Sequence, residues 1–219
     1  MMSIATSRLL LSALLGLILA GCTATASSVA RSAQSQPSVP VSITNYRTQV
    51  DEKFPVPAVD TEKLKTRNMR QLVDYPTNHP PGTLVVDTKH RFVYLVQEGG
   101  KALRYGVGVG REGVEFTGSV TVGLKREWPR WTPTPDMIKR EPERYAQWAD
   151  GMQGGPQNPL GARALYLYKD GKDTLFRIHG TNEPESIGHA VSSGCIRMMN
   201  QDVIDLYQRV PPGSRVVVE

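Results

Sequence analysis

The chain has 219 residues, a formal net charge of +5 and 39% hydrophobic residues, and it contains only two cysteines. That length allows one domain of moderate size with an appendage, or two small domains. The ordinary apolar content, together with 21% charged residues, excludes a disordered or fibrous chain. Two cysteines exclude a disulfide scaffold, and the sequence has no C-x-x-C motif or Cys/His cluster that predicts a metal site. The mild positive charge, without a basic run, does not indicate nucleic acid binding.

The first 21 residues are predicted to be an export signal. Arg8 is the only early charge, Leu9–Leu19 is apolar, and two small residues precede Cys22. A basic start, about 7–15 apolar residues and a small-residue end are typical of a secretory signal. The last four residues, Leu-Ala-Gly-Cys, resemble a bacterial lipobox, in which the cysteine is lipidated and becomes the mature N-terminus. The resemblance implies a periplasm-facing protein anchored by lipid to an envelope membrane; the alternative is an ordinary signal peptide with a chance cysteine.

Two segments separate this signal from the expected main domain, which covers residues 81–219. Residues 22–42 are rich in Ser, Ala, Thr, Gln and Pro and cannot bury enough apolar surface to order themselves, so they predict a flexible tether. Residues 43–80 distribute apolar residues among several prolines. We expect this stretch to be an extended arm packed on the domain, with a helical turn near Glu62–Asp74.

From Pro81 onward the pattern is mainly β. Short runs rich in β-branched and aromatic residues alternate with Gly- and Asp-containing turns, such as residues 98–101 and 169–172. The predicted strands are Thr83–Asp87, Arg91–Gln97, Ala102–Val109, Gly118–Val122, Ala164–Tyr168, Thr174–Ile178 and Arg215–Val218.

Helix is scarce in the sequence. Asn200 is expected to be the N-cap of a helix over Gln201–Arg209, which Pro211 and Pro212 would end. A second short helical stretch is expected over Asp136–Trp148, interrupted or restarted at Pro142. Many short strands with so little helix predict a mainly β fold, a mixed β-sandwich with one or two short helices.

A glycine motif at residues 108–113 matches the dinucleotide fingerprint G-x-G-x-x-G. That fingerprint requires a strand feeding a helix whose N-terminus holds the pyrophosphate. Here the glycines are followed by Val-Glu-Phe-Thr-Gly-Ser-Val-Thr-Val, which is typical of a strand. The sequence therefore predicts a turn between two strands and no dinucleotide site.

The chemistry is expected around Cys195. A thiol becomes a nucleophile when a base or a positive environment removes its proton, and His179 lies sixteen residues earlier, across a loop containing Gly and Ser. Gly194 permits an unusual backbone conformation in which neighbouring N–H groups point at a developing oxyanion. A lipidated Cys22 could not form a disulfide with Cys195, which would then keep its thiol in an oxidising compartment. The residues alone leave two interpretations: Cys/His acyl transfer, or a buried structural cysteine near a satisfied histidine.

Three motifs carry a resemblance to a known family. They are His-Gly-Thr-Asn at 179–182 with Ser-Ser-Gly-Cys-Ile-Arg-Met at 192–198, Asn-Pro-Leu-Gly at 158–161, and Trp-Pro-Arg-Trp-Thr-Pro at 128–133. Together they resemble the bacterial L,D-transpeptidases, whose catalytic domain is of the YkuD type. The resemblance covers about residues 81–219 and implies the catalytic fold of that family.

The resemblance implies a role for each matching residue. Cys195 matches the nucleophile and His179 the general base, and the carbonyl of Gly180 matches the group that orients the imidazole. Gly194 and Ser193 are expected beside the oxyanion, and the matching residues Arg197 and Ser192 are substrate-binding candidates. Arg197 would either bind a carboxylate or brace the loop. Ser193 stands where many members carry a second histidine, and His189 is expected to be an ordinary loop histidine.

The other candidates have structural alternatives. Trp128, Trp131 and Trp148 would either line a groove or pack in the core. Asn158 is expected to cap a turn, whereas His79 and His90 are expected to be solvated. The scattered carboxylates do not form the pair that glycoside hydrolysis requires.

The resemblance implies an enzyme that acts on peptidoglycan stem peptides and needs no metal or organic cofactor. The thiolate would cleave the bond between a diaminopimelate-type residue and D-Ala, form a thioester, and pass the acyl group to an amine. The product would be a 3→3 cross-link or an attached envelope protein. An L,D-carboxypeptidase that trims stem peptides and a catalytically inert peptidoglycan-binding lipoprotein remain as alternatives.

Overall fold

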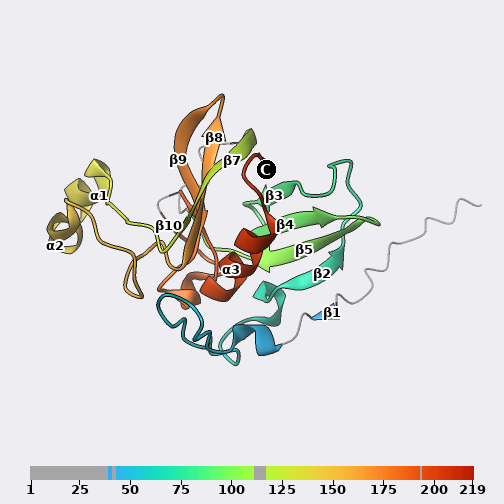
Figure 1. Cartoon of the computed structure of the whole chain (residues 1–219), viewed down its shortest axis with the longest axis horizontal. Coiled ribbons are helices and arrows are strands. Elements are labelled where there is room, and N and C mark those ends of the chain that lie inside the picture. The colour runs from blue at the N-terminus through green and yellow to red at the C-terminus, as the bar shows by residue number, and fades with distance from the viewer. Residues whose placement is uncertain (1–38, 41–42, 111–116, 193) are drawn as a thin grey trace, which may run out of the picture. The chain divides into compact units, whose positions relative to one another are not determined.

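The computed structural model describes residues 39–40, 43–110, 117–192 and 194–219 (Figure 1). The expected signal, Cys22 and most of the expected tether lie outside these residues, as do residues 111–116 and Ser193. Among the residues described, no helix is long and apolar enough to cross a membrane.

The strands are β1 Val39–Pro40, β2 Gln71–Asp74, β3 Leu84–Asp87, β4 Phe92–Gln97, β5 Lys101–Gly106, β6 Val109–Gly110, β7 Gly118–Glu127, β8 Arg163–Lys169, β9 Lys172–His179, β10 Ala190–Ser192, β11 Ile196–Arg197 and β12 Arg215–Val218. Ten of them form one ladder in the order β1-β2-β5-β4-β3-β12-β7-β8-β9-β11, and β6 pairs with β10. The sheet is mixed, because β12 runs parallel to β3 and antiparallel to β7 and β11 runs parallel to β9. A mainly β fold with few short helices is thereby confirmed.

One apolar core joins the two halves of this ladder. It takes buried side chains from β3, β4 and β5 on one side and from β7, β8, β9 and β12 on the other. Helix α3, Asn200–Arg209, adds Val203 and Leu206 to the same cluster and lies across the strands in Figure 1. A fully buried Val or Leu side chain contributes about 1.5–3 kcal/mol, so this shared core holds the strand ends that carry the site in place.

The remaining helical elements are short: η1 Ile43–Tyr46, η2 Thr66–Asn68, α1 Pro135–Arg140, α2 Pro142–Tyr145, η3 Ala146–Trp148 and η4 Pro184–Ser186. Helix α1 begins after Thr134, whose hydroxyl accepts the Met137 N–H at 3.2 Å. It ends at Arg140 because Pro142 disfavours helical geometry in Glu141, the residue before it, and α2 starts at that proline. The expected helical stretch with a restart at Pro142 is thus confirmed. In Figure 1, α1 and α2 stand at the far left, away from the strands.

One local prediction is wrong. The residue before α3 is Met199, and Asn200 is its first helical residue, with a side chain that bonds elsewhere. The helical turn expected near Glu62–Asp74 is the 3₁₀ turn η2, and residues 71–74 form β2, which pairs with β5. Burial alternates along β2, since Gln71 and Val73 are buried while Leu72 is exposed, and this period of two is that of a strand rather than a helix.

The structure describes residues 108–110 of the glycine motif at residues 108–113. Gly110 ends β6, and β7 begins at Gly118, with residues 111–116 outside the described part. The described residues on either side are strands, as expected for a turn within a β structure.

Candidate active site

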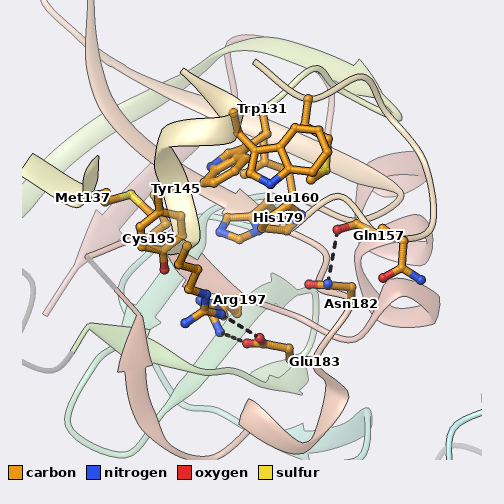
Figure 2. A pocket seen from close by; sticks show the side chains of 14 residues that line it. Trp131, Met137, Tyr145, Gln157, Leu160, His179, Asn182, Glu183, Cys195 and Arg197 are labelled. Atoms are coloured by element: carbon orange, nitrogen blue, oxygen red, sulfur yellow. Dashed lines mark hydrogen bonds and ion pairs between the residues drawn. The ribbon is translucent and has the colours of Figure 1, made fainter. Parts of the chain in front are cut away.

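Cys195, His179 and Arg197 line one pocket with a volume of about 240 Å³. Figure 2 shows the His179 ring in the middle of this pocket, with Trp131 and Leu160 on one side and Arg197 beside Glu183 on the other. The pocket therefore brings together the thiol, the imidazole and a guanidinium from segments that the sequence separates by up to eighteen residues.

His179 is the last residue of β9 and is only 4% exposed. Its Nδ1 donates a hydrogen bond to the Gly180 carbonyl oxygen at 2.6 Å. Because a carbonyl only accepts, this bond places the proton on Nδ1 and leaves Nε2 with its lone pair. Burial lowers the pKa of His179 to about 4, against the Gly180 bond, and the charges of Arg197 and Arg177 add to the lowering. The imidazole is therefore neutral near pH 7 and able to accept a proton.

Cys195 follows a turn between β10 and β11. Gly194 has φ of +115°, a conformation that residues with side chains rarely adopt, and an added Cβ would lie 3.4 Å from the Phe176 ring. Burial raises the pKa of the Cys195 thiol, although a hydrogen bond from the Arg177 backbone and the charges of Arg177 and Arg197 act in the opposite direction. Near pH 7 the thiol and the imidazole are therefore both uncharged.

Strand pairing fixes the position of this segment relative to the base. β11 runs parallel to β9 with Arg197 opposite His179, and the Met198 N–H donates to the His179 carbonyl at 2.8 Å. On the other side, the backbone of Arg197 exchanges two hydrogen bonds of 2.9 Å with Gly108. Two residues after the thiol, the chain is therefore held on both sides.

Asn200 forms a second link between segments of the site, and this role was not predicted from the sequence. Its Oδ1 accepts the Ala162 N–H at 2.9 Å, and its Nδ2 donates to the Thr181 carbonyl at 2.9 Å. The amide thus links the start of β8 to the turn after His179. An added Cβ at Gly180 would come within 2.1 Å of Asn200 Oδ1, so only glycine permits this close approach. The sequence signal for this close contact was Gly180, the glycine directly after His179.

Glu183 bridges two arginines at the rim of the pocket. Its Oε2 lies 2.9 Å from Arg197 Nη1, and its Oε1 lies 3.3 Å from Arg144 Nη2 on α2. The helical segment also contributes Tyr145, whose ring packs edge-on against Trp131 with centroids 6.0 Å apart. One wall of the pocket thus comes from α1, α2 and η3, and neither Arg144 nor Glu183 was predicted from the sequence.

The three tryptophans take different roles, some lining the pocket and one packing in the core. Trp131 and Trp148 line the pocket. Trp128 is buried against Val56 in a separate apolar cluster, and its Nε1 donates to Glu52 at 3.2 Å. Trp128 is therefore a core residue.

Other candidates lie away from the thiol or outside the description. His189 lines a different pocket of about 440 Å³ between η4 and residues 59–68. Asn158 is buried, and its Oδ1 accepts the Leu160 N–H at 2.9 Å, which confirms its turn. Ser193 and the side chain of Ser192 lie outside the described part of the chain. Within that part, no three His, Cys, Asp or Glu side chains form a group that could hold a metal ion.

Comparison with known proteins places this geometry in a family. Residues 81–218 match the family described as the L,D-transpeptidase catalytic domain, YkuD. The probable L,D-transpeptidases ErfK/SrfK and YbiS of Escherichia coli K12 are 34% identical over 139 residues and 31% identical over 165 residues. These matches cover 63% and 73% of this chain, which spans 43% and 52% of the length of the two relatives.

A solved structure is also similar. The Brucella melitensis protein described as a probable carnitine operon oxidoreductase is 50% identical, with a TM-score of 0.50, over 73% of this chain and 99% of that chain. The family match covers more than half of the sequence and includes both Cys195 and His179. The chain therefore belongs to the L,D-transpeptidase catalytic domain (YkuD) family.

Proposed function

We propose that this protein is a peptidoglycan L,D-transpeptidase in which Cys195 is the nucleophile and His179 the general base. The observation that carries the proposal is the pairing of a protonated thiol with a buried imidazole whose tautomer is fixed, in one pocket of a chain of this family. A neutral imidazole with a free Nε2 lone pair has the protonation state that a general base requires.

Acylation uses both groups. Nε2 of His179 takes the thiol proton as Sγ attacks the carbonyl carbon between the diaminopimelate-type residue and D-Ala of a donor stem peptide. The imidazolium then gives that proton to the amine of D-Ala as the C–N bond breaks, and a thioester remains on Cys195. Amide N–H groups beside Gly194 stabilise the oxyanion of the tetrahedral intermediate, a contribution of about 2.7–4 kcal/mol per donor in comparable sites.

An amine resolves the thioester. It attacks the thioester carbonyl, loses a proton to His179, and the C–S bond breaks as Cys195 regains its proton. A stem-peptide amine gives a 3→3 cross-link, an envelope protein gives a covalent attachment, and water gives carboxypeptidase trimming. Arg197 and Glu183 form an ion pair in the pocket, which supports a role for Arg197 in bracing the loop.

The Brucella relative's description brings an oxidoreductase into consideration. A dinucleotide site at the glycine motif would need a helix to follow β6. Within the motif, residues 109–110 form β6, which pairs with β10 beside the thiol turn, and β7 follows the motif from Gly118. These contacts favour a role for the motif in holding the site over cofactor binding.

The proposal extends to where the protein acts. The first 22 residues, ending in Leu-Ala-Gly-Cys, support export and lipidation of Cys22, which would place the enzyme on an envelope membrane next to its substrate. Labelling cells with a fatty acid tests this, since a Cys22→Ser variant would lose the label while a Cys195→Ala variant would keep it.

Muropeptide analysis tests the activity. The full chain is incubated with disaccharide tetrapeptides, and products are compared with those of Cys195→Ala. Dimers with a 3→3 link and equimolar free D-Ala are expected. Tripeptides with D-Ala and no dimers would identify a carboxypeptidase, and an unchanged mixture with folded protein would contradict the proposal.

A further inference from the structure

Strand β9 is broken by a bulge at residues 174–176, directly before the segment that carries His179. On one side of the bulge Arg177 is paired with Tyr166 of β8, and on the other Asp173 is paired with Tyr168, with a shift of register between them. Leu175 lies in this bulge with φ of +65° and a side chain that is 73% exposed. A large apolar residue in a left-handed conformation is strained, and this one gains little burial in return.

Side chains lock the bulge where ladder bonds are interrupted. Asp173 Oδ1 accepts the Leu175 N–H at 2.8 Å, and the same carboxylate accepts two hydrogen bonds from the Arg177 guanidinium at 2.7 and 2.8 Å. The Thr174 hydroxyl donates to the Leu167 carbonyl at 2.6 Å and accepts the Phe176 N–H at 3.2 Å. The strained conformation is therefore held by specific contacts on both sides of Leu175.

Three consecutive residues of this segment lie next to the turn that carries Gly194 and Cys195. The Leu175 carbonyl oxygen lies 3.9 Å from Cys195 Sγ and accepts its weak S–H hydrogen bond. An added Cβ at position 194 would lie 3.4 Å from the Phe176 ring, at van der Waals contact. The backbone of Arg177 bonds to the sulfur and favours its anionic form. The sulfur thus receives an acceptor and a donor from this one segment, and the backbone conformation of Leu175 sets the direction of its carbonyl.

We propose that the bulge of residues 173–177 positions the nucleophile, with Leu175 as the positioning residue at its centre. In the resting enzyme the Leu175 carbonyl holds the neutral thiol. When the proton leaves for His179, the Arg177 amide stabilises the sulfur that remains. The link to turnover rests on the proposed transpeptidase function, whereas the positioning of the thiol does not.

Substitutions at one position separate backbone conformation from side chain. Leu175→Gly removes the side chain but adopts φ of +65° without strain, and Leu175→Ala controls for the loss of the side chain alone. Leu175→Val is expected to leave this conformation, because β-branched residues disfavour it more than leucine does. Thr174→Val, which removes both hydrogen bonds of the hydroxyl at similar volume, disturbs the bulge by a second route.

Two readouts apply to every variant that retains a cooperative thermal transition. The first is the pH dependence of Cys195 alkylation by iodoacetamide, followed on the peptide that contains Cys195 so that Cys22 does not interfere. The second is kcat and KM for release of D-Ala from a tetrapeptide donor.

The Gly and Ala variants are expected to match the wild type. Leu175→Val and Thr174→Val are expected to displace the alkylation curve and to lower kcat roughly tenfold to a hundredfold with little change in KM, as misplacement of a reacting atom does. If Val and Gly variants behave alike, or if neither Val variant displaces the curve, the inference is wrong. If the wild type releases no D-Ala, the proposed function fails, and the alkylation curves still decide the inference.

Discussion

The two walls of the pocket are built differently. The wall that carries the base and the thiol consists of strand ends and the start of α3, where His179, Thr181, Met198 and Met199 are all buried. The opposite wall consists of α1, α2 and η3, and none of the residues 135–148, all of them described, is buried. The first wall is tied by backbone ladders and by Asn200, and the second reaches the first through the Arg144–Glu183 ion pair and the Trp131–Tyr145 contact.

This difference separates chemistry from recognition. Proton transfer between sulfur and nitrogen tolerates little misplacement, which suits a wall fixed by buried hydrogen bonds. A wall of exposed short helices is held by surface contacts that contribute little stability, which suits adjustment to the peptide substrate of the proposed function. Mutations in the first wall should therefore lower kcat and stability, whereas mutations in the second wall should raise KM.

The largest effect is expected for His179→Ala. Without the general base of the proposed mechanism, kcat should fall by about 10²–10⁴. D-Ala release under single-turnover conditions measures this loss. The matched control is His189→Ala, which changes a histidine in the other pocket and should leave kcat unchanged. Equal losses in the two variants would contradict the assignment of His179.

Asn200→Ala should weaken the first wall itself. It leaves the Ala162 N–H and the Thr181 carbonyl without this partner, and each unsatisfied buried group costs about 1–3 kcal/mol. We expect a loss of about 2–3 kcal/mol in the free energy of urea unfolding, together with a lower kcat. Asn200→Asp keeps the acceptor for Ala162 and should lose less of both. If Asn200→Ala loses the expected stability but keeps the wild-type kcat, Asn200 stabilises the fold without contributing to the site.

Asp202→Asn tests how α3 is anchored. Asp202 is fully buried, the Tyr46 hydroxyl bonds to its carboxylate at 3.1 Å, and Arg70 Nε lies 4.0 Å away. Burial raises the pKa of Asp202 from 3.8 to about 7. Since the folded protein holds a proton that the unfolded chain releases, this stabilising contribution is complete below about pH 4 and disappears as the pH rises through 7.

The wild type should therefore lose about 2–3 kcal/mol relative to Asp202→Asn between pH 5 and pH 8. Urea unfolding of both proteins at the two pH values measures the difference. The lowered pKa of His179 acts with the opposite sign, because the unfolded chain binds a proton first as the pH falls below 6.5, but it is common to both proteins and cancels. Parallel pH profiles would show that Asp202 does not titrate in this range.

The smallest effect is expected for Arg144→Ala in the second wall. Loss of the exposed pair with Glu183 should change the free energy of unfolding by less than about 1 kcal/mol and raise KM a few-fold with kcat unchanged. Arg140→Ala, in the neighbouring helix α1, is the control for charge. A drop in kcat for Arg144→Ala comparable to that for Asn200→Ala would remove the distinction between the two walls.

The sequence predicts the first wall better than the second. The His-Gly and Gly-Cys motifs reflect local backbone requirements, and the structure places both motifs at one pocket. Strand positions follow from alternating burial and turn glycines. Asn200 was misassigned because an asparagine at a helix start ordinarily caps it, and the competing contact with Ala162 comes from a segment 38 residues away. The residue type of Leu175 gives no sign of its conformation, which is imposed by Asp173, Thr174 and the pairing with β8.

The most direct test of Cys195 as the nucleophile is the mass of the acyl-enzyme. The full chain is mixed with a disaccharide tetrapeptide, quenched in acid, digested and analysed by mass spectrometry. The account predicts an adduct of the donor minus D-Ala on the peptide that contains Cys195, absent from Cys195→Ala and retained in Arg144→Ala. An adduct on another residue, or none on a folded wild type that still consumes the donor, would contradict it.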